Sequence, residues 1–216
     1  MQAPGFLARG IYAITPDWHD FGHVLAVCEG LLVEGLSALQ YRNKGTQSLV
    51  TRRQHLRSLK LACERFRTPL IVNDDLSLAM EFDCGLHLGM HDGDVAVARR
   101  QLGSKAVLGA SCYDQPSLAL RAAAGGATYV AHGAFFPSRT KPNAAVARLE
   151  LLGAELPADV MKVAIGGIQP LHVPTLVSAG AELVAVIDGL FSAPDPVMAL
   201  RSYRTAFFSS KGPHFR

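Results

Sequence analysis

The chain has 216 residues, of which 49% are hydrophobic and 18% charged, with a formal net charge of +3. This composition excludes a disordered or collagen-like chain, and so small a positive surplus with few aromatic residues is not typical of nucleic-acid-binding proteins. The four cysteines form no CxxC pair, so neither a zinc module nor a disulfide scaffold is expected. No apolar stretch reaches the ~18 residues of a membrane span, and the N-terminus lacks a signal-peptide pattern. We therefore expect a cytoplasmic protein without nucleic-acid or membrane partners.

Short apolar runs alternate with longer segments of helical pattern along the chain. Continuous apolar runs are typical of parallel strands that are covered on both faces. They predict strands at residues 11–15, 36–41, 69–73, 84–88, 106–110, 127–132, 161–165 and 182–187. The segments that follow them predict helices near residues 21–34, 46–66, 75–82, 94–102, 115–124, 145–153, 170–179 and 193–208.

Eight strand–helix units in 216 residues predict a single α/β domain, a (β/α)8 TIM barrel. An open, doubly wound sheet is the rival architecture, because periodicity alone does not separate the two. The barrel domain is expected to span residues 1–210, and residues 211–216 to form a C-terminal tail. In either architecture the functional residues should follow the C-terminal ends of the strands.

Polar and cationic residues follow the second predicted strand. Strand alternation places Gln40, Arg42 and Lys44 on one side, facing the mouth of the barrel. Two cations and an amide suit a multiply charged anion such as a diphosphate. Ordinary solvated charge at a strand end is the competing interpretation, because the motif is short.

Acidic and amide residues follow the third and fourth strands. Asp74 and Asp92 are candidate ligands of one Mg²⁺ ion, which takes one or two protein carboxylates and fills its octahedral shell with water and phosphate oxygens. Asn73 is an uncharged donor to the phosphates. Helix N-capping is the competing interpretation for each aspartate, with Asp75 and Asp94 as good cap candidates. The nearby histidine at position 87 is expected to pack or to bond to backbone rather than to act in catalysis.

Later loops add further candidates. Ser111 follows the fifth strand, where its hydroxyl would bond a substrate heteroatom or cap the loop. The long loop of residues 133–142 carries hydroxyl and cationic side chains and is the expected lid. Gly166 and Gly167 follow the seventh strand and predict either close approach of backbone N–H groups to an oxyanion or only a tight turn. Residues 187–189 would form the other half of that phosphate cup.

Taken together, the segments QYRNK, IVNDD, GLHLGMHD, GAS, FFPSRTK and AIGGI resemble the signatures of the thiamine-phosphate synthase family, in the same order and with similar spacing. The resemblance covers nearly the whole chain, from GIYAIT to AVIDGL. It implies a (β/α)8 barrel that joins a hydroxymethylpyrimidine diphosphate to a hydroxyethylthiazole phosphate, releases diphosphate and uses Mg²⁺. Phosphorylated small molecules are then the expected partners, and a homo-oligomer is left open.

The resemblance also implies roles for individual residues. Asp74 and Asp92 would bind Mg²⁺, and Gly166 and Gly167 would receive the thiazole phosphate. The pyrimidine diphosphate would be held by Gln40, Arg42, Lys44 and Asn73, with Ser111 near the pyrimidine. Both substrates would be covered by Ser138, Thr140 and Lys141. The expected catalytic residues are Arg42, Ser111 and Lys141, because charge stabilisation at the departing diphosphate replaces an enzyme nucleophile.

Several positions depart from the family pattern, and one of them bears on the substrate. Asp188 stands where a small hydroxyl residue normally helps to bind the thiazole phosphate. A carboxylate that points at this phosphate would repel it, so either Asp188 turns away or the affinity for the thiazole substrate has changed. A catalytically silent thiamine-phosphate-binding homologue is therefore one alternative function. The other is a related thiazole tautomerase, although such relatives carry a histidine where this chain has Ala134.

Overall fold

The computed structural model describes residues 7–17, 20–45, 47–137 and 146–210. Eight parallel strands pair in chain order, and the first strand also pairs with the last, so the sheet closes into a barrel. The strands are β1 (Gly10–Ile14), β2 (Ala38–Tyr41), β3 (Leu70–Asn73), β4 (Gly85–Leu88), β5 (Leu108–Tyr113), β6 (Tyr129–His132), β7 (Met161–Ile165) and β8 (Leu183–Val186). The predicted (β/α)8 barrel is confirmed, and the open sheet is excluded by the pairing of β1 with β8.

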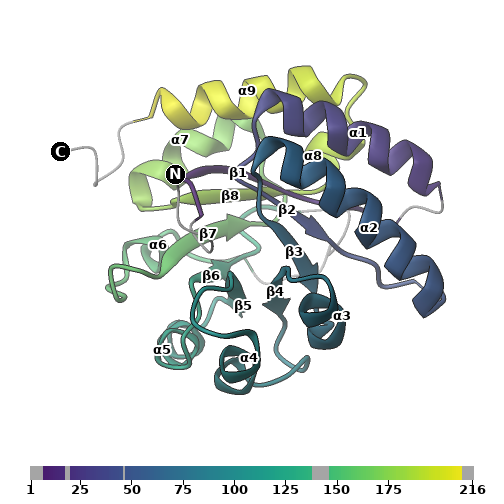
Figure 1. Ribbon diagram of the computed structural model, residues 1–216. Helices are drawn as coiled ribbons and strands as arrows, with labels where there is room; N and C mark the ends of the chain where they lie inside the picture. The colour runs from purple at the N-terminus through teal and green to yellow at the C-terminus, as the bar shows by residue number, and fades with distance from the viewer. Residues whose placement is uncertain (1–6, 18–19, 46, 138–145, 211–216) are drawn as a thin grey trace.

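Helices surround the barrel, and α1 lies alongside both α2 and α9 (Figure 1). The helices are α1 (Phe21–Glu34), α2 (Leu49–Phe66), α3 (Leu76–Glu81), α4 (Val95–Leu102), α5 (Pro116–Ala124), α6 (Glu150–Gly153), α7 (Val173–Ala179), α8 (Asp188–Phe191) and α9 (Pro196–Phe208), with a 3₁₀ helix η1 (Pro170–His172) before α7. Two of them differ from the prediction. Helix α6 is shorter than the predicted 145–153, and α8 was not predicted because four residues are too few to show a helical period.

Buried side chains form two layers of core. An inner layer fills the barrel and includes Tyr12, Tyr129 and Val163. An outer layer packs the strands against the helices and includes Leu39 and Val72. Successive strand residues point to opposite faces, so both faces of these strands are covered, which is why their sequences are continuously apolar.

Aspartates at the strand-to-helix turns divide into caps and non-caps. Oδ1 of Asp75 accepts from the backbone N–H of Leu78 at 2.9 Å and caps α3. Oδ1 of Asp94 caps α4 in the same way, through Val97 N–H at 2.9 Å. The capping prediction is confirmed for these two residues, which leaves Asp74 and Asp92 for another role.

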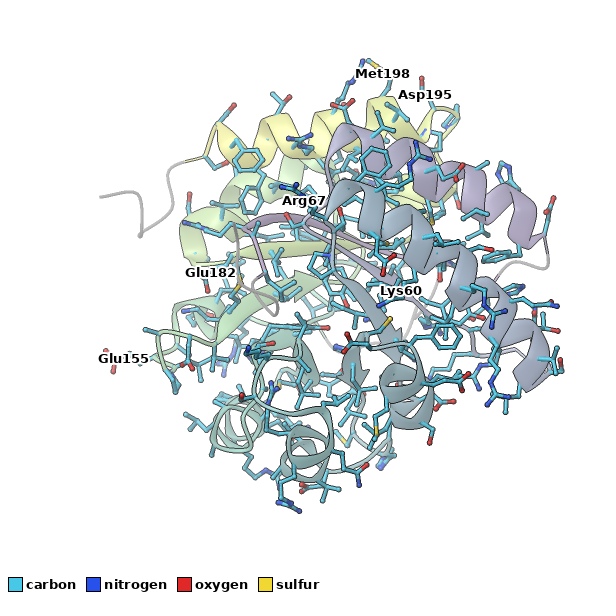
Figure 2. All side chains as sticks on the ribbon, viewed as in Figure 1. Lys60, Arg67, Glu155, Glu182, Asp195 and Met198 are labelled. Atoms are coloured by element: carbon cyan, nitrogen blue, oxygen red, sulfur yellow. The ribbon has the colours of Figure 1, made fainter. Side chains whose placement is uncertain are left out.

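The outer surface carries many of the charged side chains. Glu155, for example, lies at the outer edge of the molecule (Figure 2). Within the described ranges, no helix combines the length and the apolar character that a membrane span requires.

Candidate active site

A cavity of about 680 Å³ opens at the C-terminal ends of the strands and is lined by residues from every strand or the loop that follows it. Ten residues predicted from the sequence line it: Gln40, Arg42, Lys44, Asn73, Asp74, Asp92, Ser111, Gly166, Gly167 and Asp188. The structure therefore brings together all the predicted site residues that it describes. The three predicted lid residues Ser138, Thr140 and Lys141 lie outside the described residues.

The two cations after β2 are each held by a carboxylate. Arg42 Nη1 forms an ion pair with Asp17, which follows β1, and Asp17 Oδ1 also accepts from the backbone N–H of Lys44 at 2.7 Å. Lys44 Nζ lies 2.5 Å from Asp74 Oδ2. The Asp74 carboxylate raises the pKa of Lys44, so the ammonium stays charged. Asp17 was not predicted as a site residue, and its position in the loop that follows a strand was the signal that could have found it.

Asp74 is fixed in an unusual backbone conformation. Its φ of 65° lies in the left-handed region, which aspartate tolerates better than most residues, and its N–H donates to the carbonyl of His87 at 2.8 Å. This bond ties the end of β3 to β4 and directs the carboxylate toward Lys44 and Asp92. Burial and the neighbouring Asp92 carboxylate raise the pKa of Asp74, against the opposing effect of Lys44.

Asp92 is held by the turn that follows β4. Its Oδ2 accepts from the N–H of Gly89 at 3.0 Å. A Cβ at position 89 would lie 2.4 Å from the same oxygen, so only glycine allows this arrangement without a shift. This contact explains why glycine stands at position 89, the second glycine of the motif GLHLGMHD.

The acidic pair Asp74 and Asp92 fits a divalent cation. The two carboxylates are close enough for Asp92 to raise the pKa of Asp74, which means that their negative charges repel and that a cation between them would relieve the repulsion. Among the described residues, no group of three or more His, Cys, Asp and Glu side chains could hold a metal. Mg²⁺ needs no such group, because it binds through one or two carboxylates together with substrate phosphates and water.

The net charge of the cavity lining also supports a divalent-cation site. Of the described lining residues, Arg42 and Lys44 are cationic, whereas Asp74, Asp92 and Asp188 are anionic. These side chains carry a net negative charge, which would repel a polyphosphate that entered the cavity without a counter-ion. A bound divalent cation would reverse the sign of this charge.

Ser111 lies on the wall formed by β4 and β5, and its hydroxyl contacts a histidine of the neighbouring strand. The ring of His87 lines the cavity, with Nε2 2.9 Å from Ser111 Oγ and Nδ1 2.9 Å from Tyr129 Oη. His87 is also 8% exposed and stacked on Tyr129, so it packs as expected, and its ring bonds to side chains in addition. Because β4 and β5 are neighbours in the barrel, their register places His87 opposite Gly109, two residues before Ser111.

Gly166 and Gly167 lie where the chain after β6 crosses the end of β7. Their φ values are 101° and 60°, in the left-handed region that favours glycine. A Cβ at Gly166 would lie 2.3 Å from Ala134 Cβ, and one at Gly167 would lie 2.2 Å from the carbonyl oxygen of Pro137. Close approach of the 134–137 segment is therefore what requires both glycines, and it leaves them exposed to the cavity.

Asp188 is the first residue of α8. It lines the cavity together with Gly189 and Ser192, on the side where Gly166 and Gly167 lie. Ser192 N–H donates to the Asp188 carbonyl at 3.0 Å, which closes the single turn of α8. The described structure thus keeps a carboxylate at the position where the family resemblance implies a small hydroxyl residue.

Comparison with known proteins identifies the family. The family model described as thiamine monophosphate synthase matches residues 11–190. A thiamine-phosphate synthase of Xanthomonas campestris is 47% identical over 201 residues, covering 93% of this chain and 96% of the relative. One of Methylobacillus flagellatus is 45% identical over 200 residues, covering 92% and 95%.

The solved structures agree as well. Thiamine phosphate pyrophosphorylase from Pyrococcus furiosus superposes with a TM-score of 0.78 at 26% identity, covering 93% of this chain and 96% of that one. The resemblance that the sequence motifs predicted is confirmed. The chain belongs to the thiamine monophosphate synthase family.

Proposed function

We propose that this protein is a thiamine-phosphate synthase, a transferase that couples hydroxymethylpyrimidine diphosphate to hydroxyethylthiazole phosphate and releases diphosphate. The observation that carries the proposal is the cavity at the strand ends, in which Arg42, Lys44, Asp74 and Asp92 gather from three separate loops. The family and the names of its close relatives support the same activity.

The pyrimidine diphosphate would bind against the wall formed by β2, β3 and β4. Arg42 and Lys44 would bind the phosphate oxygens, and Asn73 would donate to them as a neutral group. Because both cations are already fixed by carboxylates, they need little reorganisation when negative charge develops on the departing diphosphate. Lys141, from the loop outside the described residues, would add a third cation to this group.

Asp74 and Asp92 would hold Mg²⁺. When bound, Mg²⁺ supplies positive charge that neutralises the diphosphate and favours its departure. Asp74 would then interact with Lys44 and the metal at the same time, since its carboxylate already contacts the ammonium.

The second substrate would lie toward β7 and β8, with its phosphate near Gly166 and Gly167 and its thiazole nitrogen facing the pyrimidine methylene. The C–O bond to diphosphate breaks with both electrons going to the leaving oxygen, and the thiazole nitrogen donates its lone pair to the methylene carbon. This reaction requires positioning and charge stabilisation rather than an enzyme nucleophile. Ser111 would orient the pyrimidine, and Ser138 and Thr140 would help to exclude water.

The test is to incubate the protein with both substrates and Mg²⁺ and to measure thiamine phosphate and diphosphate. The expected result is equal amounts of both products, with Arg42→Ala and Lys141→Ala each reducing kcat/KM by about 100-fold or more, as expected for loss of a charged contact to the transition state. Arg121→Ala, on α5, is the control and should leave kcat/KM unchanged.

Three outcomes would contradict the proposal. Isomerisation of a thiazole phosphate without coupling would favour the tautomerase function. Binding of thiamine phosphate without turnover would favour a silent binding protein, and unchanged diphosphate affinity in Arg42→Ala would contradict the assigned site.

A further inference from the structure

A chain of hydrogen bonds crosses the interior of the barrel beneath the cavity. Gln40 Nε2 donates to Tyr12 Oη at 2.5 Å, and Tyr12 Oη lies 2.9 Å from Tyr129 Oη. Tyr129 Oη lies 2.9 Å from His87 Nδ1, and His87 Nε2 lies 2.9 Å from Ser111 Oγ. Five side chains from β1, β2, β4, β5 and β6 are thus linked in one series.

Four members of this chain line the cavity and are themselves largely buried, whereas Tyr129 lies behind them. Tyr12 and Tyr129 are 1% and 0% exposed, and Gln40 and His87 are 2% and 8% exposed. Gln40 and Ser111 line the cavity, but Tyr129 does not. Since a buried polar atom without a partner is costly, the hydroxyl of Tyr129, which does not line the cavity, depends on its neighbours in the chain.

The single proton of each hydroxyl gives the chain a direction. One donor order satisfies every link: Tyr12 accepts from Gln40 and donates to Tyr129, and Tyr129 donates to His87 Nδ1. In this order the His87 ring carries a proton on Nε2, which is donated to Ser111 Oγ. Burial raises the pKa of both Tyr12 and Tyr129, which keeps these protons in place.

We propose that this directed chain makes Ser111 a hydrogen-bond donor and the carbonyl of Gln40 an acceptor toward the ligand, and that His87 and Tyr129 are positioning residues for the pyrimidine. Ser111 accepts from His87 at the end of the chain, so its own proton is not used within the chain. That proton is therefore donated to an acceptor in the cavity. The Gln40 nitrogen is turned toward Tyr12, so the amide presents its oxygen. Because His87 Nε2 carries a proton, His87 does not act as a base toward Ser111.

This pattern selects a class of ring. An aminopyrimidine offers a ring nitrogen as acceptor and an exocyclic amino group as donor, which match Ser111 and Gln40. The corresponding oxopyrimidine offers a ring N–H and a carbonyl oxygen, the reverse pattern. A site that bonds one pattern rejects the other, because buried polar groups are left without partners. The inference rests on the proposed function for the identity of the ring, but the direction of the chain does not depend on it.

The first experiment examines the ligand-free protein. ¹⁵N NMR of protein labelled at histidine, with His87 assigned from the signals lost in His87→Gln, should show Nε2 protonated and Nδ1 unprotonated. A proton on Nδ1 would reverse the chain and overturn the proposal. This result is independent of turnover, so it distinguishes failure of the proposed chain from failure of the proposed synthase activity.

The second experiment breaks the chain where no ligand touches it. Tyr129→Phe should raise the KM for the pyrimidine diphosphate by about 5- to 10-fold, the effect of roughly one hydrogen bond. The same variant should reduce the preference for the amino over the oxo substrate and leave the KM for the thiazole phosphate unchanged. The matched control is Tyr41→Phe, which removes a buried tyrosine bond to His55 Nδ1 at 3.0 Å outside this chain. Equal effects of the two variants would contradict the proposal.

The third experiment separates positioning from packing at His87. Glutamine offers an oxygen for the Tyr129 proton and an N–H for Ser111, as the proposed ring does, whereas leucine offers neither. His87→Gln should therefore retain most of the amino-over-oxo preference, and His87→Leu should lose it by about tenfold. Equal loss in both variants would show that only the shape of His87 matters and would overturn its role in the chain.

Discussion

Arg42 forms an ion pair with Asp17, and the same carboxylate accepts a hydrogen bond from the backbone N–H of Lys44 at 2.7 Å. One side chain after β1 therefore fixes both cations that follow β2. The side chains of Arg42 and Asp17 are 20% and 37% exposed, so the value of this carboxylate lies in geometry more than in ion-pair energy.

Two substitutions of Asp17 should separate geometry from charge. Asp17→Asn keeps an acceptor for Lys44 N–H and removes a negative charge near the substrate, so the KM for the pyrimidine diphosphate should not increase. Asp17→Ala removes the acceptor as well, and this KM should rise by about 3- to 10-fold, as for loss of one or two hydrogen bonds. Steady-state kinetics checks both values. An increase of similar size in the two variants would mean that charge, and not positioning, is what Asp17 contributes.

Asp92 and Asp94 lie two residues apart and have different roles in the structure, which gives a matched pair of variants. Asp92 lines the cavity, whereas Asp94 caps α4. Asp92→Asn should raise the Mg²⁺ concentration that gives half-maximal activity by at least about tenfold, because a carboxylate ligand is lost. Asp94→Asn should leave it unchanged, since asparagine is also a good cap. A Mg²⁺ titration in which both variants follow the wild type would exclude Asp92 as a ligand.

Asp188 should weaken the binding of the thiazole phosphate. Replacing it by the small hydroxyl residue, in Asp188→Ser, should lower the KM for the thiazole phosphate by about tenfold, because a unit negative charge near a phosphate costs on the order of 1 kcal/mol or more at the edge of a protein. The KM for the pyrimidine diphosphate should not change. Asp195→Ser is the control, because Asp195 caps α9 and lies at the outer edge of the molecule (Figure 2). A higher thiazole KM in Asp188→Ser would show that the carboxylate assists binding.

Gly109 gives room to the ring of Tyr129. A Cβ at position 109 would lie 1.9 Å from Tyr129 Cζ, inside the buried centre of the barrel. Gly109→Ala should therefore lower the melting temperature by about 5 °C or more, the effect of 1–3 kcal/mol of overpacking in a domain of this size. Gly153→Ala, where the nearest atom is 3.8 Å away, should not lower it. Calorimetry of the two variants tests this, and equal melting temperatures would contradict the packing argument.

The barrel and most of its site could be predicted from the sequence, because both depend on local patterns. Continuous apolar runs such as residues 161–165 mark strands covered on both faces, and polar residues directly after them mark the mouth. Position at the strand ends also distinguishes the metal candidates Asp74 and Asp92 from the cap candidates Asp75 and Asp94, and the hydrogen bonds of α3 and α4 confirm the two caps.

The tertiary structure alone decided which side chains bond to each other across strands. Tyr12 and Tyr129 are 117 residues apart and look like ordinary apolar strand residues in the sequence, yet their hydroxyls meet at 2.9 Å inside the barrel. The same holds for His87 with Ser111 and for Asp17 with Arg42. A sequence records which face of a strand a residue occupies, but the distance between residues on different strands is set by barrel closure and register, which are properties of the folded chain as a whole.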